Sequence, residues 1–465
     1  MPNPIELRGK RVLVVGLART GVATASFCTL RGAHVTATDL RAEPEIASAG
    51  KLRASGVTLR FGQHEESILD RQGLVVTSPG VAADAPLLVA ARARGITVWS
   101  EIELAYRFLR DDACLIGITG SNGKTTTSTL IAHILTTAGL RTVLAGNIGT
   151  PLISVVEQLE RDSNVVAELS SFQLELIESF RPSISVFLNL TPDHLDRHGS
   201  MEAYARAKTR IFENQLPLDA AVLNADEDAT VALVPSRPRL YWFSHKKAVE
   251  SGVYIRREEI VFRANRSGAE EILVRLQDIP LPGAHNLENV LAAAAVARLA
   301  GVTPAAIAAG VRTFAGVEHR LEFVAEIAGV RYYNDSKATN VDATLKALDA
   351  FPGRILVILG GKDKGSDYTL LRDPLRAKGV LALLIGAAAA KIESQIAGSV
   401  AIDRVDTLER AVESASQAAR SGDVVLFAPA CASFDQFQNY EHRGRVFKDL
   451  VHQLQHQAAS APRRK

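Results

Sequence analysis

The chain has 465 residues, about three times the length of a typical domain, which predicts two to four domains. Its 53 Lys and Arg residues nearly balance its 51 Asp and Glu residues, which excludes a general nucleic-acid binder with a basic surface. Three widely spaced cysteines, Cys28, Cys114 and Cys431, exclude a disulfide framework and a cysteine-rich metal site. Because we find no export signal and no apolar run long enough to span a bilayer, we expect a cytoplasmic protein without membrane contact.

The first predicted strand, 11–16, ends in a glycine turn that precedes a helical stretch. The turn has the spacing Gly16-x-Ala18-x-x-Gly21, which is similar to a dinucleotide-binding fingerprint but lacks its central glycine. Asp39 ends the next predicted strand, where a dehydrogenase carries a ribose-binding acid. This segment therefore allows two interpretations, a nicotinamide-dependent oxidoreductase or a purely structural turn.

A second glycine turn, GITGSNGKTT at 117–126, lies between an apolar strand and an amphipathic helical pattern. In such a turn the backbone N–H groups approach a phosphate chain, a lysine meets the outer phosphates, and a threonine hydroxyl reaches Mg²⁺. Lys124 and Thr125 have these places here, although the first glycine of the usual motif is offset. The sequence context predicts a nucleotide site, and the alternative is a simple structural turn.

Polar residues follow two more predicted strands of this part of the chain. Glu168 comes at the end of an apolar run, where its carboxylate can bind Mg²⁺ directly or through water. The segment 189–198 gathers aspartates and histidines that suit metal or phosphate contacts. A charged strand edge and a solvated polar turn would have the same composition, so both alternatives stay open.

Lys208 lies on an apolar face of a predicted helix, with Tyr204, Ile211 and Phe212 at i−4, i+3 and i+4. A lysine on such a face is partly desolvated, which lowers its pKa and favours the neutral amine. A neutral amine can react with CO₂ to give a carbamate, which is an oxygen ligand for a hard cation. On the residues alone, however, a lysine that extends its ammonium into water is the favoured interpretation.

The remaining chain continues the alternation of apolar strands and helices, with further strands at 354–361 and 423–430. Such alternation is typical of parallel sheets that are covered on both faces. The segment 235–280 alternates differently, as antiparallel hairpins do, and predicts a small β-subdomain. We therefore expect α/β domains built on parallel sheets, with one seam after the helical pattern 101–112 and a second near 314–320.

Taken together, the motifs resemble those of the Mur ligase family of ATP-dependent amide-forming ligases. They occur in the order of the family and extend over nearly the whole chain. The segments that carry the resemblance are GITGSNGKTTT (117–127), GNIGTP (146–151), ELSSFQLE (168–175), NLTPDHLDRHG (189–199), AYARAK (203–208), GAHNLENVLAA (283–293), EHRLE (318–322), NDSKATN (334–340) and ACASFDQF (430–437).

The resemblance implies a three-domain α/β ligase, with Rossmann-like first and third domains around a central P-loop domain, divided as 1–111, 112–316 and 317–465. These domains would bind a UDP-sugar, ATP and an amino acid in turn. The segments NDSKATN, GGKDKGSD and SFDQFQNYEHRG are most similar to the members that add D-glutamate to UDP-N-acetylmuramoyl-L-alanine. The implied reaction proceeds through an acyl phosphate and a tetrahedral intermediate and uses ATP and two Mg²⁺ ions. A monomer in the cytoplasm, in peptidoglycan precursor synthesis, is the implied context.

The resemblance also assigns roles to residues of the ATP site. Lys124 would contact the γ-phosphate, Thr125 and Glu168 would hold one Mg²⁺, and His194 with carbamylated Lys208 would hold the second. The further residues implied to contact ATP are Gly117, Ile118, Thr119, Gly120, Ser121, Asn122, Gly123, Thr126, Asn286, Asn289, Arg320, Asp335 and Lys337.

For the other two substrates the resemblance implies two more sets. The UDP-substrate would be held by Arg19, Thr20, Asp39, Arg41, Ser78, Asn147 and His194. The glutamate carboxylates would be held by Lys364, Ser433 and Tyr440, and the position of Tyr440 is usually phenylalanine in the family. Cys431 lies beside this set, and we interpret it as a buried apolar residue rather than a reactive thiol.

Three alternatives to this function remain open on the sequence. A related ligase could add a different amino acid, such as L-alanine, a diamino acid or glutamate on a folate. An NAD-dependent oxidoreductase would explain the first glycine turn but not the second turn or Lys208. A P-loop scaffold without ligase chemistry would hydrolyse ATP regardless of any UDP-sugar.

Overall fold

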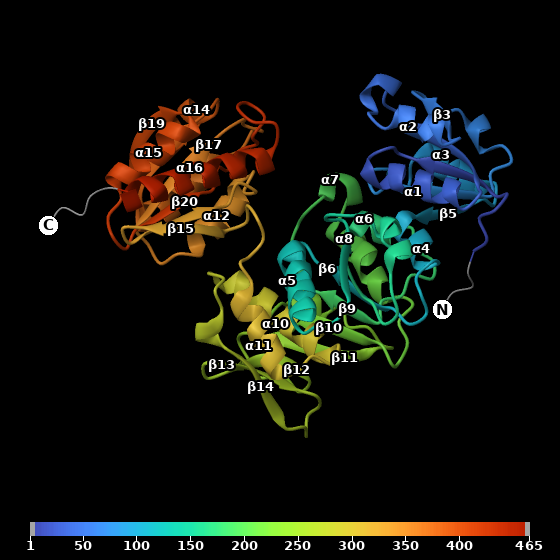
Figure 1. The fold of residues 1–465 in the computed structure, drawn as a ribbon, viewed down its shortest axis with the longest axis horizontal. Coiled ribbons are helices and arrows are strands. Elements are labelled where there is room, and N and C mark those ends of the chain that lie inside the picture. The colour runs from blue at the N-terminus through green and yellow to red at the C-terminus, as the bar shows by residue number, and fades with distance from the viewer. Residues whose placement is uncertain (1–4, 461–465) are drawn as a thin grey trace. The chain divides into compact units, whose positions relative to one another are not determined.

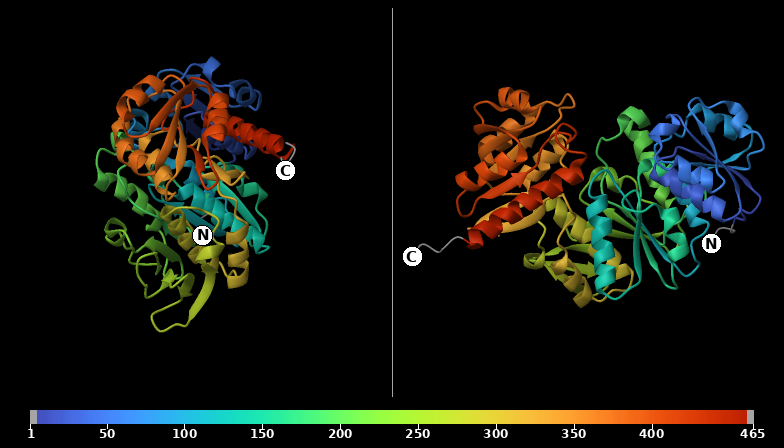
Figure 2. Two further views of the ribbon diagram at one scale, coloured as in Figure 1. Left: turned by 90° about the vertical axis from the view of Figure 1, so that its left-hand side faces the viewer. Right: turned by 45° about the horizontal axis from the view of Figure 1, so that its top comes forward.

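The computed structural model describes residues 5–460, which form three β-sheets with helices beside their strands (Figures 1 and 2). The chain divides into two compact units. Of the described residues, 5–279 and 288–313 form one unit, which holds the first two sheets, and 280–287 and 314–460 form the other, which holds the third. Among the helices within 5–460, none is long and apolar enough to cross a membrane.

The first sheet has the order β3-β2-β1-β4-β5, and all its neighbouring strands are parallel. Its central strand is buried along four of its five residues because it is covered on both faces. The elements are β1 (Arg11–Val15), α1 (Arg19–Leu30), β2 (His34–Asp39), η1 (Glu43–Glu45), α2 (Ala49–Ala54), β3 (Thr58–Phe61), η2 (Glu66–Leu69), β4 (Leu74–Thr77), α3 (Pro86–Ala93), β5 (Thr97–Ser100) and α4 (Glu101–Tyr106).

The second sheet has nine strands in the order β14-β13-β12-β11-β10-β9-β6-β8-β7. Its strands are β6 (Cys114–Thr119), β7 (Thr142–Gly146), β8 (Asn164–Glu168), β9 (Ile184–Phe187), β10 (Ala220–Asn224), β11 (Arg239–Ser244), β12 (Gly252–Arg256), β13 (Glu259–Arg263) and β14 (Glu270–Arg275). Its helices are α5 (Lys124–Thr137), η3 (Leu152–Ser154), η4 (Val156–Gln158), α6 (Ser171–Leu174), α7 (Leu195–His198), α8 (Met201–Thr209), η5 (Arg210–Phe212), α9 (Asp228–Val231), η6 (Leu276–Asp278), α10 (Ala284–Leu299) and α11 (Pro304–Thr313).

The strands of 235–280 differ in part from the expected antiparallel hairpins. β12, β13 and β14 are antiparallel, as predicted, but β11 is parallel to both β10 and β12. The residues 245–251 between β11 and β12 carry the chain back across the sheet, which a tight hairpin turn would not do. Alternation of polar and apolar residues identifies a strand but does not give its direction, so this part of the prediction was wrong.

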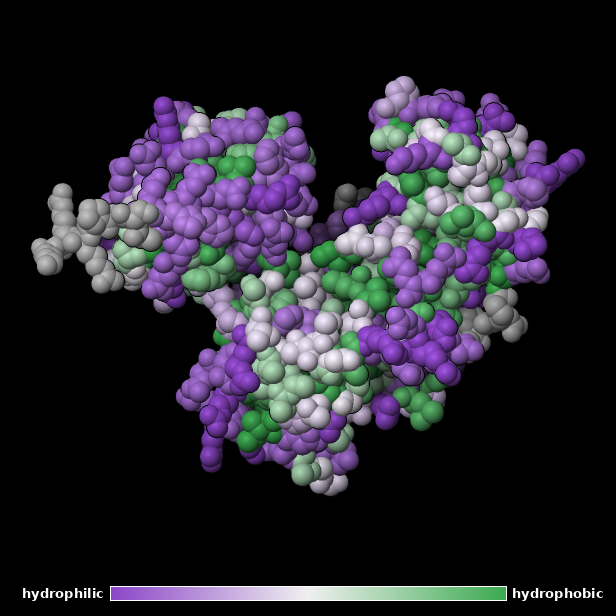
Figure 3. Space-filling model, viewed as in Figure 1, coloured by the Kyte–Doolittle hydropathy of each residue, from purple (hydrophilic) through white to green (hydrophobic). Residues whose placement is uncertain are grey.

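The third sheet has the order β15-β16-β20-β17-β18-β19, with only β15 and β16 antiparallel among its pairs. Helices α14, α15 and α16 bury their apolar residues against it and present mainly hydrophilic residues to solvent (Figure 3). The elements are β15 (Glu322–Ile327), β16 (Val330–Asn334), α12 (Val341–Asp349), β17 (Ile355–Gly360), η7 (Tyr368–Leu371), α13 (Arg372–Lys378), β18 (Gly379–Ile385), α14 (Ala389–Ile396), β19 (Ala401–Asp406), α15 (Leu408–Ala418), β20 (Val424–Phe427) and α16 (Tyr440–Ser460).

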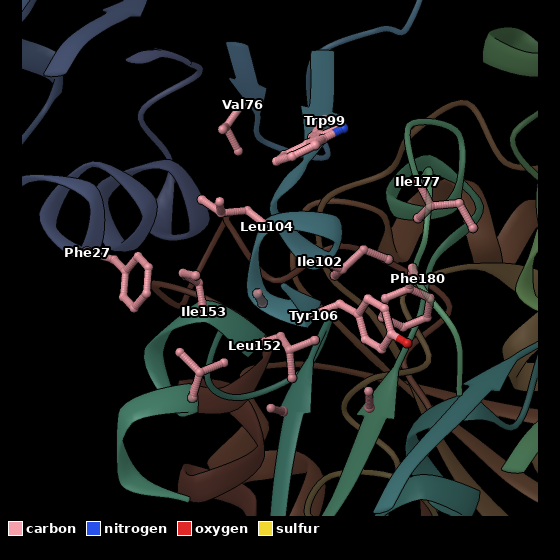
Figure 4. Close-up of a cluster of buried hydrophobic side chains, with 14 of the residues drawn as sticks. Phe27, Val76, Trp99, Ile102, Leu104, Tyr106, Leu152, Ile153, Ile177 and Phe180 are labelled. Atoms are coloured by element: carbon pink, nitrogen blue, oxygen red, sulfur yellow. The ribbon is translucent and has the colours of Figure 1, made fainter. Parts of the chain in front are cut away.

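The first two sheets share one apolar core, which lies around α4. Figure 4 shows Trp99 and Tyr106 from the first domain pointing toward the same region as Leu152 and Phe180 from the second. The rings of Tyr106 and Phe180 meet edge to face, with centroids 5.6 Å apart. Burial of each large apolar side chain stabilises the folded state by about 2 kcal/mol, so this shared core joins the two domains firmly.

Two buried glutamates of α4 add polar links across the same boundary. The Glu103 carboxylate accepts backbone N–H groups of 178–180 at 2.8–2.9 Å and the Arg107 Nε–H at 2.7 Å. Glu101 accepts the N–H of Ile153 at 2.6 Å, and burial raises its pKa to about 7. Carboxylates bonded in this way fix the α4 segment to two loops of the second domain.

Candidate active site

The glycine turn after β6 continues directly into α5, as the sequence predicts. Gly123 has a φ of 82°, and a Cβ atom there would lie 2.3 Å from Asn289 Oδ1. Asn289 also accepts the hydroxyl of Thr127 at 3.1 Å, so the turn is held against α10. The first N–H groups of the 14-residue α5 therefore form an anion-binding end, which suits a phosphate chain.

Two lysines meet at one carbonyl group of this turn. Lys124 Nζ donates to the carbonyl oxygens of Gly120 and Ser121, both at 2.8 Å, and Lys208 Nζ donates to the same Gly120 oxygen at 2.8 Å. Lys208 is only 1% exposed, and burial, followed by the charge of Lys124, lowers its pKa to about 6. The favoured interpretation of a solvated ammonium was therefore wrong, because the face defined by its neighbours is enclosed on every side.

The surroundings of Lys208 link α8 to the phosphate turn. Its Nζ lies 4.7 Å from the centroid of the Tyr204 ring, one helical turn away. The Tyr204 hydroxyl lies 3.2 Å from the Ser121 hydroxyl, which donates to the Thr191 carbonyl at 2.9 Å. The amine is consequently held between the turn and an aromatic face, and its burial beside the charge of Lys124 favours the neutral form.

Thr125, Glu168 and Asn147 form a second polar group at the ends of β7 and β8. The Thr125 hydroxyl donates to Glu168 Oε2 at 2.9 Å, and the Asn147 side-chain amide donates to Oε1 at 2.9 Å. In the part of the chain that the structure describes, no cluster of three His, Cys, Asp or Glu residues could hold a metal ion by itself. One carboxylate beside a hydroxyl and a phosphate site nevertheless fits Mg²⁺, which usually takes one or two carboxylates together with phosphate and water.

The segment 189–199 packs against the phosphate turn through amides rather than through its charged residues. The Asn189 side chain accepts the N–H of Asn122 at 2.8 Å and donates to its carbonyl at 3.1 Å. His194 lies further out, with a φ of 52°, a half-exposed ring and a contact of 4.9 Å to the Phe172 ring. The structure therefore brings Lys124, Lys208, Thr125 and Glu168 to the turn, and it leaves His194 outside this set of contacts.

The first glycine turn joins β1 to α1 and is closed by residues of neighbouring strands. A Cβ at Gly21 would lie 1.7 Å from the Gly16 carbonyl oxygen, and the Ser78 hydroxyl donates to that oxygen at 2.8 Å. Asp39 accepts the N–H of Leu17 at 2.7 Å and a two-pronged bond from the Arg41 guanidinium at 2.8–2.9 Å. This guanidinium holds the pKa of the Asp39 carboxyl well below its usual range.

The predicted substrate residues of the first domain thus gather at one edge of its sheet. Asp39 ends β2 and Ser78 directly follows β4, the two strands on either side of β1, and α1 starts after β1 with Arg19 and Thr20. Asn147, by contrast, belongs to the Glu168 group of the second domain. Its role as a UDP-substrate residue stays a prediction.

In the second unit, Asp335 lies directly after β16 and bonds to the segment before β15. Its carboxylate accepts the Leu321 N–H at 3.2 Å, and burial raises its pKa to about 6. The Lys337 N–H donates to the His319 carbonyl at 3.1 Å, which fixes the predicted Arg320 between two bonded residues. Asn286, in the part of α10 that belongs to this unit, donates through its side chain to Pro282 at 2.7 Å.

The predicted glutamate residues occupy two loops of the third sheet. Lys364 is exposed in the loop after β17, whereas Ser433 is buried and Tyr440 begins α16. Burial raises the pKa of Tyr440 to about 12. Cys431 is also buried, which confirms the interpretation of a buried residue, and burial raises the pKa of its thiol to about 11.

Sequence reasoning missed the residues that support these two loops. Asp363 accepts the Tyr368 hydroxyl and the Lys391 ammonium, both at 2.8 Å, and so ties down the loop that carries Lys364. Arg443 is 1% exposed and donates to the Cys431 carbonyl at 3.2 Å. Arg443 lies within the SFDQFQNYEHRG segment, but its partners are mainly backbone atoms, which leave no pattern in a sequence.

Comparisons with protein families cover each of the three sheets. Residues 10–100 match the Mur ligase MurD-like N-terminal domain, 118–297 match the Mur ligase middle domain, and 319–431 match the Mur ligase glutamate ligase domain. Together these matches extend over more than half of the chain and agree with three α/β domains. They end within the boundaries that we predict, which themselves stay predictions.

Two similar proteins and one solved structure extend this likeness. The UDP-N-acetylmuramoylalanine--D-glutamate ligase of Acidobacterium capsulatum is 52% identical over 98% of this chain and 99% of its own length. The ligase of the same name from Koribacter versatilis is 51% identical over 97% and 99% of the two chains. The MurF ligase of Thermotoga maritima, in complex with ADP, has a similar fold, with a TM-score of 0.59, 17% identity and 98% coverage of both chains.

Proposed function

The chain belongs to the Mur ligase family, and we propose that it joins D-glutamate to UDP-N-acetylmuramoyl-L-alanine with ATP, in peptidoglycan precursor synthesis. The observation that carries this function is the phosphate turn, at which Lys124 and buried Lys208 share the Gly120 carbonyl beside the Thr125–Glu168 pair. These four side chains lie where an ATP-dependent ligase needs positive charge and oxygen ligands. The similarity over nearly the full length supports the same substrates as those of the relatives.

The reaction has two steps that these residues serve. A substrate carboxylate oxygen attacks the γ-phosphorus of ATP, so that an acyl phosphate forms and ADP leaves. The amine of D-glutamate then attacks the acyl carbon, and the tetrahedral intermediate expels phosphate, loses a proton and becomes the amide. Lys124 and the N–H groups at the start of α5 stabilise the negative charge on the phosphate oxygens throughout.

Magnesium is part of this proposal, since the donor set fits it. Thr125 and Glu168 are the residues that would hold one Mg²⁺ at the phosphate turn. With a pKa of about 6, the amine of Lys208 is mostly neutral at pH 7 and can add to CO₂ to form a carbamate. Together with His194, this carbamate would hold a second Mg²⁺, and both ions would neutralise phosphate charge.

For the other substrates, we place the UDP-substrate at the edge of the first sheet formed by Asp39, Arg41 and Ser78. The glutamate carboxylates would meet Lys364, Ser433 and Tyr440 in the third domain. A monomer in the cytoplasm remains our expectation. A nicotinamide-dependent oxidoreductase leaves the Thr125–Glu168 pair and Lys208 without a role, and the family membership argues against it.

Phosphate release with purified protein tests the proposal. We expect release with ATP, Mg²⁺, UDP-N-acetylmuramoyl-L-alanine and D-glutamate together, and none when any one of them is omitted. L-Alanine, L-glutamate and a diamino acid replace D-glutamate in parallel reactions. Equal release without D-glutamate would indicate a P-loop ATPase, and stronger release with another amino acid would indicate a different ligase.

A further inference from the structure

The Arg197 side chain crosses from the second domain to the loop that follows β4 of the first. Its Nη1 donates to the Pro79 carbonyl at 3.0 Å, and its Nη2 donates to the Val81 carbonyl at 2.8 Å. These carbonyls belong to the loop that begins with Ser78. One guanidinium thus holds two points of the loop, and its planar fork suits this pair of acceptors.

Beneath the guanidinium lies a set of side chains that keep it in place. Its central carbon is 3.9 Å from the centroid of the Phe172 ring, and its Nη2 donates to Glu175 Oε2 at 3.4 Å. The other oxygen of Glu175 is 3.3 Å from His198 Nδ1, and the Arg197 side chain is only 18% exposed. The pKa of the Glu175 carboxyl is raised, because the effect of burial exceeds the opposite effect of the Arg197 guanidinium.

The same set continues toward the reacting centre. The Phe172 ring contacts the His194 ring at 4.9 Å and stacks on the His198 ring at 5.3 Å. The His198 ring in turn lies 5.2 Å from the Tyr204 ring, which faces Lys208 at 4.7 Å. A continuous group of packed side chains therefore connects the loop at 78–81 with the phosphate turn.

We propose that Arg197 is a positioning residue, which fixes the substrate loop 78–81 to the segment that carries His194. This inference rests on the proposed function, in which that loop binds the UDP-substrate. The two domains can then present the substrate carboxylate to the phosphate turn in one fixed geometry, and small displacements of such a geometry reduce turnover strongly. Lysine cannot replace the arginine, because a single ammonium cannot bond two carbonyls with the same planar geometry.

Arg107 offers a matched control at the same domain boundary. Its guanidinium lies 4.5 Å from the Trp99 ring, bonds to Glu103 at 2.7 Å and is 11% exposed. It also donates to the Ser179 hydroxyl of the second domain at 2.8 Å. Arg107 and Arg197 therefore have similar burial, aromatic support and bridging contacts, but only Arg197 contacts the substrate loop.

The test compares Arg197→Lys with Arg107→Lys by steady-state kinetics and thermal unfolding. For Arg197→Lys we expect a KM for the UDP-substrate at least about fivefold higher and a kcat at least about fivefold lower, with the KM for ATP changed less than about twofold. For Arg107→Lys we expect a lower unfolding temperature and kinetic constants within about twofold of the wild-type values. Phe172→Leu removes the support beneath the guanidinium and should reproduce the selective change at a smaller size.

The proposal is overturned if Arg197→Lys only lowers the unfolding temperature, as Arg107→Lys does, or if it raises the KM for ATP equally. If Arg197→Lys does not fold, unchanged kinetics of Phe172→Leu would overturn it instead. Phosphate release by the wild-type chain distinguishes a failure of this inference from a failure of the proposed function. Absence of glutamate-dependent phosphate release there contradicts the function, whereas normal release with unchanged variants contradicts only the role of Arg197.

Discussion

Two glycine turns of this molecule occupy the same place, between a parallel strand and a helix, but have different side-chain surroundings. Each follows a strand with parallel neighbours on both sides, β1 or β6, and continues into a long helix, α1 or α5. Each also requires glycine at a close approach, at Gly21 against a carbonyl oxygen and at Gly123 against Asn289. In both, the first N–H groups of the helix point out of the turn.

The side chains around the two turns differ in charge. The turn after β1 is closed by the Asp39 carboxylate and the Ser78 hydroxyl. The turn after β6 is closed by two lysines, Lys124 and Lys208, which share one carbonyl oxygen. In both turns the backbone offers a place for an anion. The side chains of neighbouring strands and helices decide which ligand binds there and which chemistry follows.

The largest effect on activity should come from removal of a lysine from the second turn. We expect Lys208→Ala to reduce kcat at least about a thousandfold, since it removes the oxygen ligand that its carbamate would supply. Formate or acetate in the assay should restore part of the activity by taking that place. Phosphate release is the measurement, and Lys51→Ala, at an exposed lysine, is the control. A fully active Lys208→Ala would show that the carbamate assignment is wrong.

A smaller effect is expected from Gly21→Ala in the first turn. Its Cβ would lie 1.7 Å from the Gly16 oxygen, so that backbone must shift, at an expected cost of about 3 kcal/mol in the free energy of unfolding. We expect the Kd for the UDP-substrate to rise while the Kd for ATP is unchanged. Gly50→Ala, where the added Cβ would meet no atom of another segment within 4 Å, should not lower the unfolding free energy. Urea unfolding and calorimetric titration with each nucleotide measure both quantities, and equal losses of the two affinities would contradict separate roles for the turns.

The smallest effect concerns the charge that closes the first turn. Because Arg41 lowers the pKa of Asp39, the carboxylate stabilises the folded state above its unfolded-state pKa of about 3.9, and this stabilisation is lost as the pH falls through the lower folded-state pKa. We expect Asp39→Asn to lower the unfolding free energy by about 1 kcal/mol at pH 7, since Arg41 is half exposed and solvent screens the pair. The difference from the wild type should shrink toward pH 2. Asp70→Asn, at an exposed ion pair of the same domain, is the control, and a constant difference across pH would contradict the assignment.

The sequence was sufficient for features that depend on local pattern. The strands predicted at 11–16, 354–361 and 423–430 are confirmed as β1, β17 and β20, because continuous apolar runs next to glycine turns are typical of buried parallel strands. The phosphate turn is confirmed as a turn between strand and helix for the same reason.

The features that could not be predicted from the sequence depend on contacts with residues far away in the chain. The i−4, i+3 and i+4 neighbours of Lys208 identified an apolar face, but its burial depends on the turn at Gly120, 88 positions away. Arg197 bonds to backbone carbonyls 116 and 118 positions away, and a carbonyl has no residue type to detect. The direction of β11 was likewise set by its neighbours in the sheet and not by its own residues.

The shared core around α4 makes the first two sheets a single cooperative element of the unfolding equilibrium. A ligand that binds only the folded form of such an element stabilises all of it, by an amount set by its concentration relative to its Kd. Occupation of the first glycine turn therefore protects the second against thermal unfolding, without any contact between the two ligands. Glu103 and its bonds to 178–180 join the two domains. The stability of one glycine turn therefore depends on that of the other, whether or not a reaction takes place.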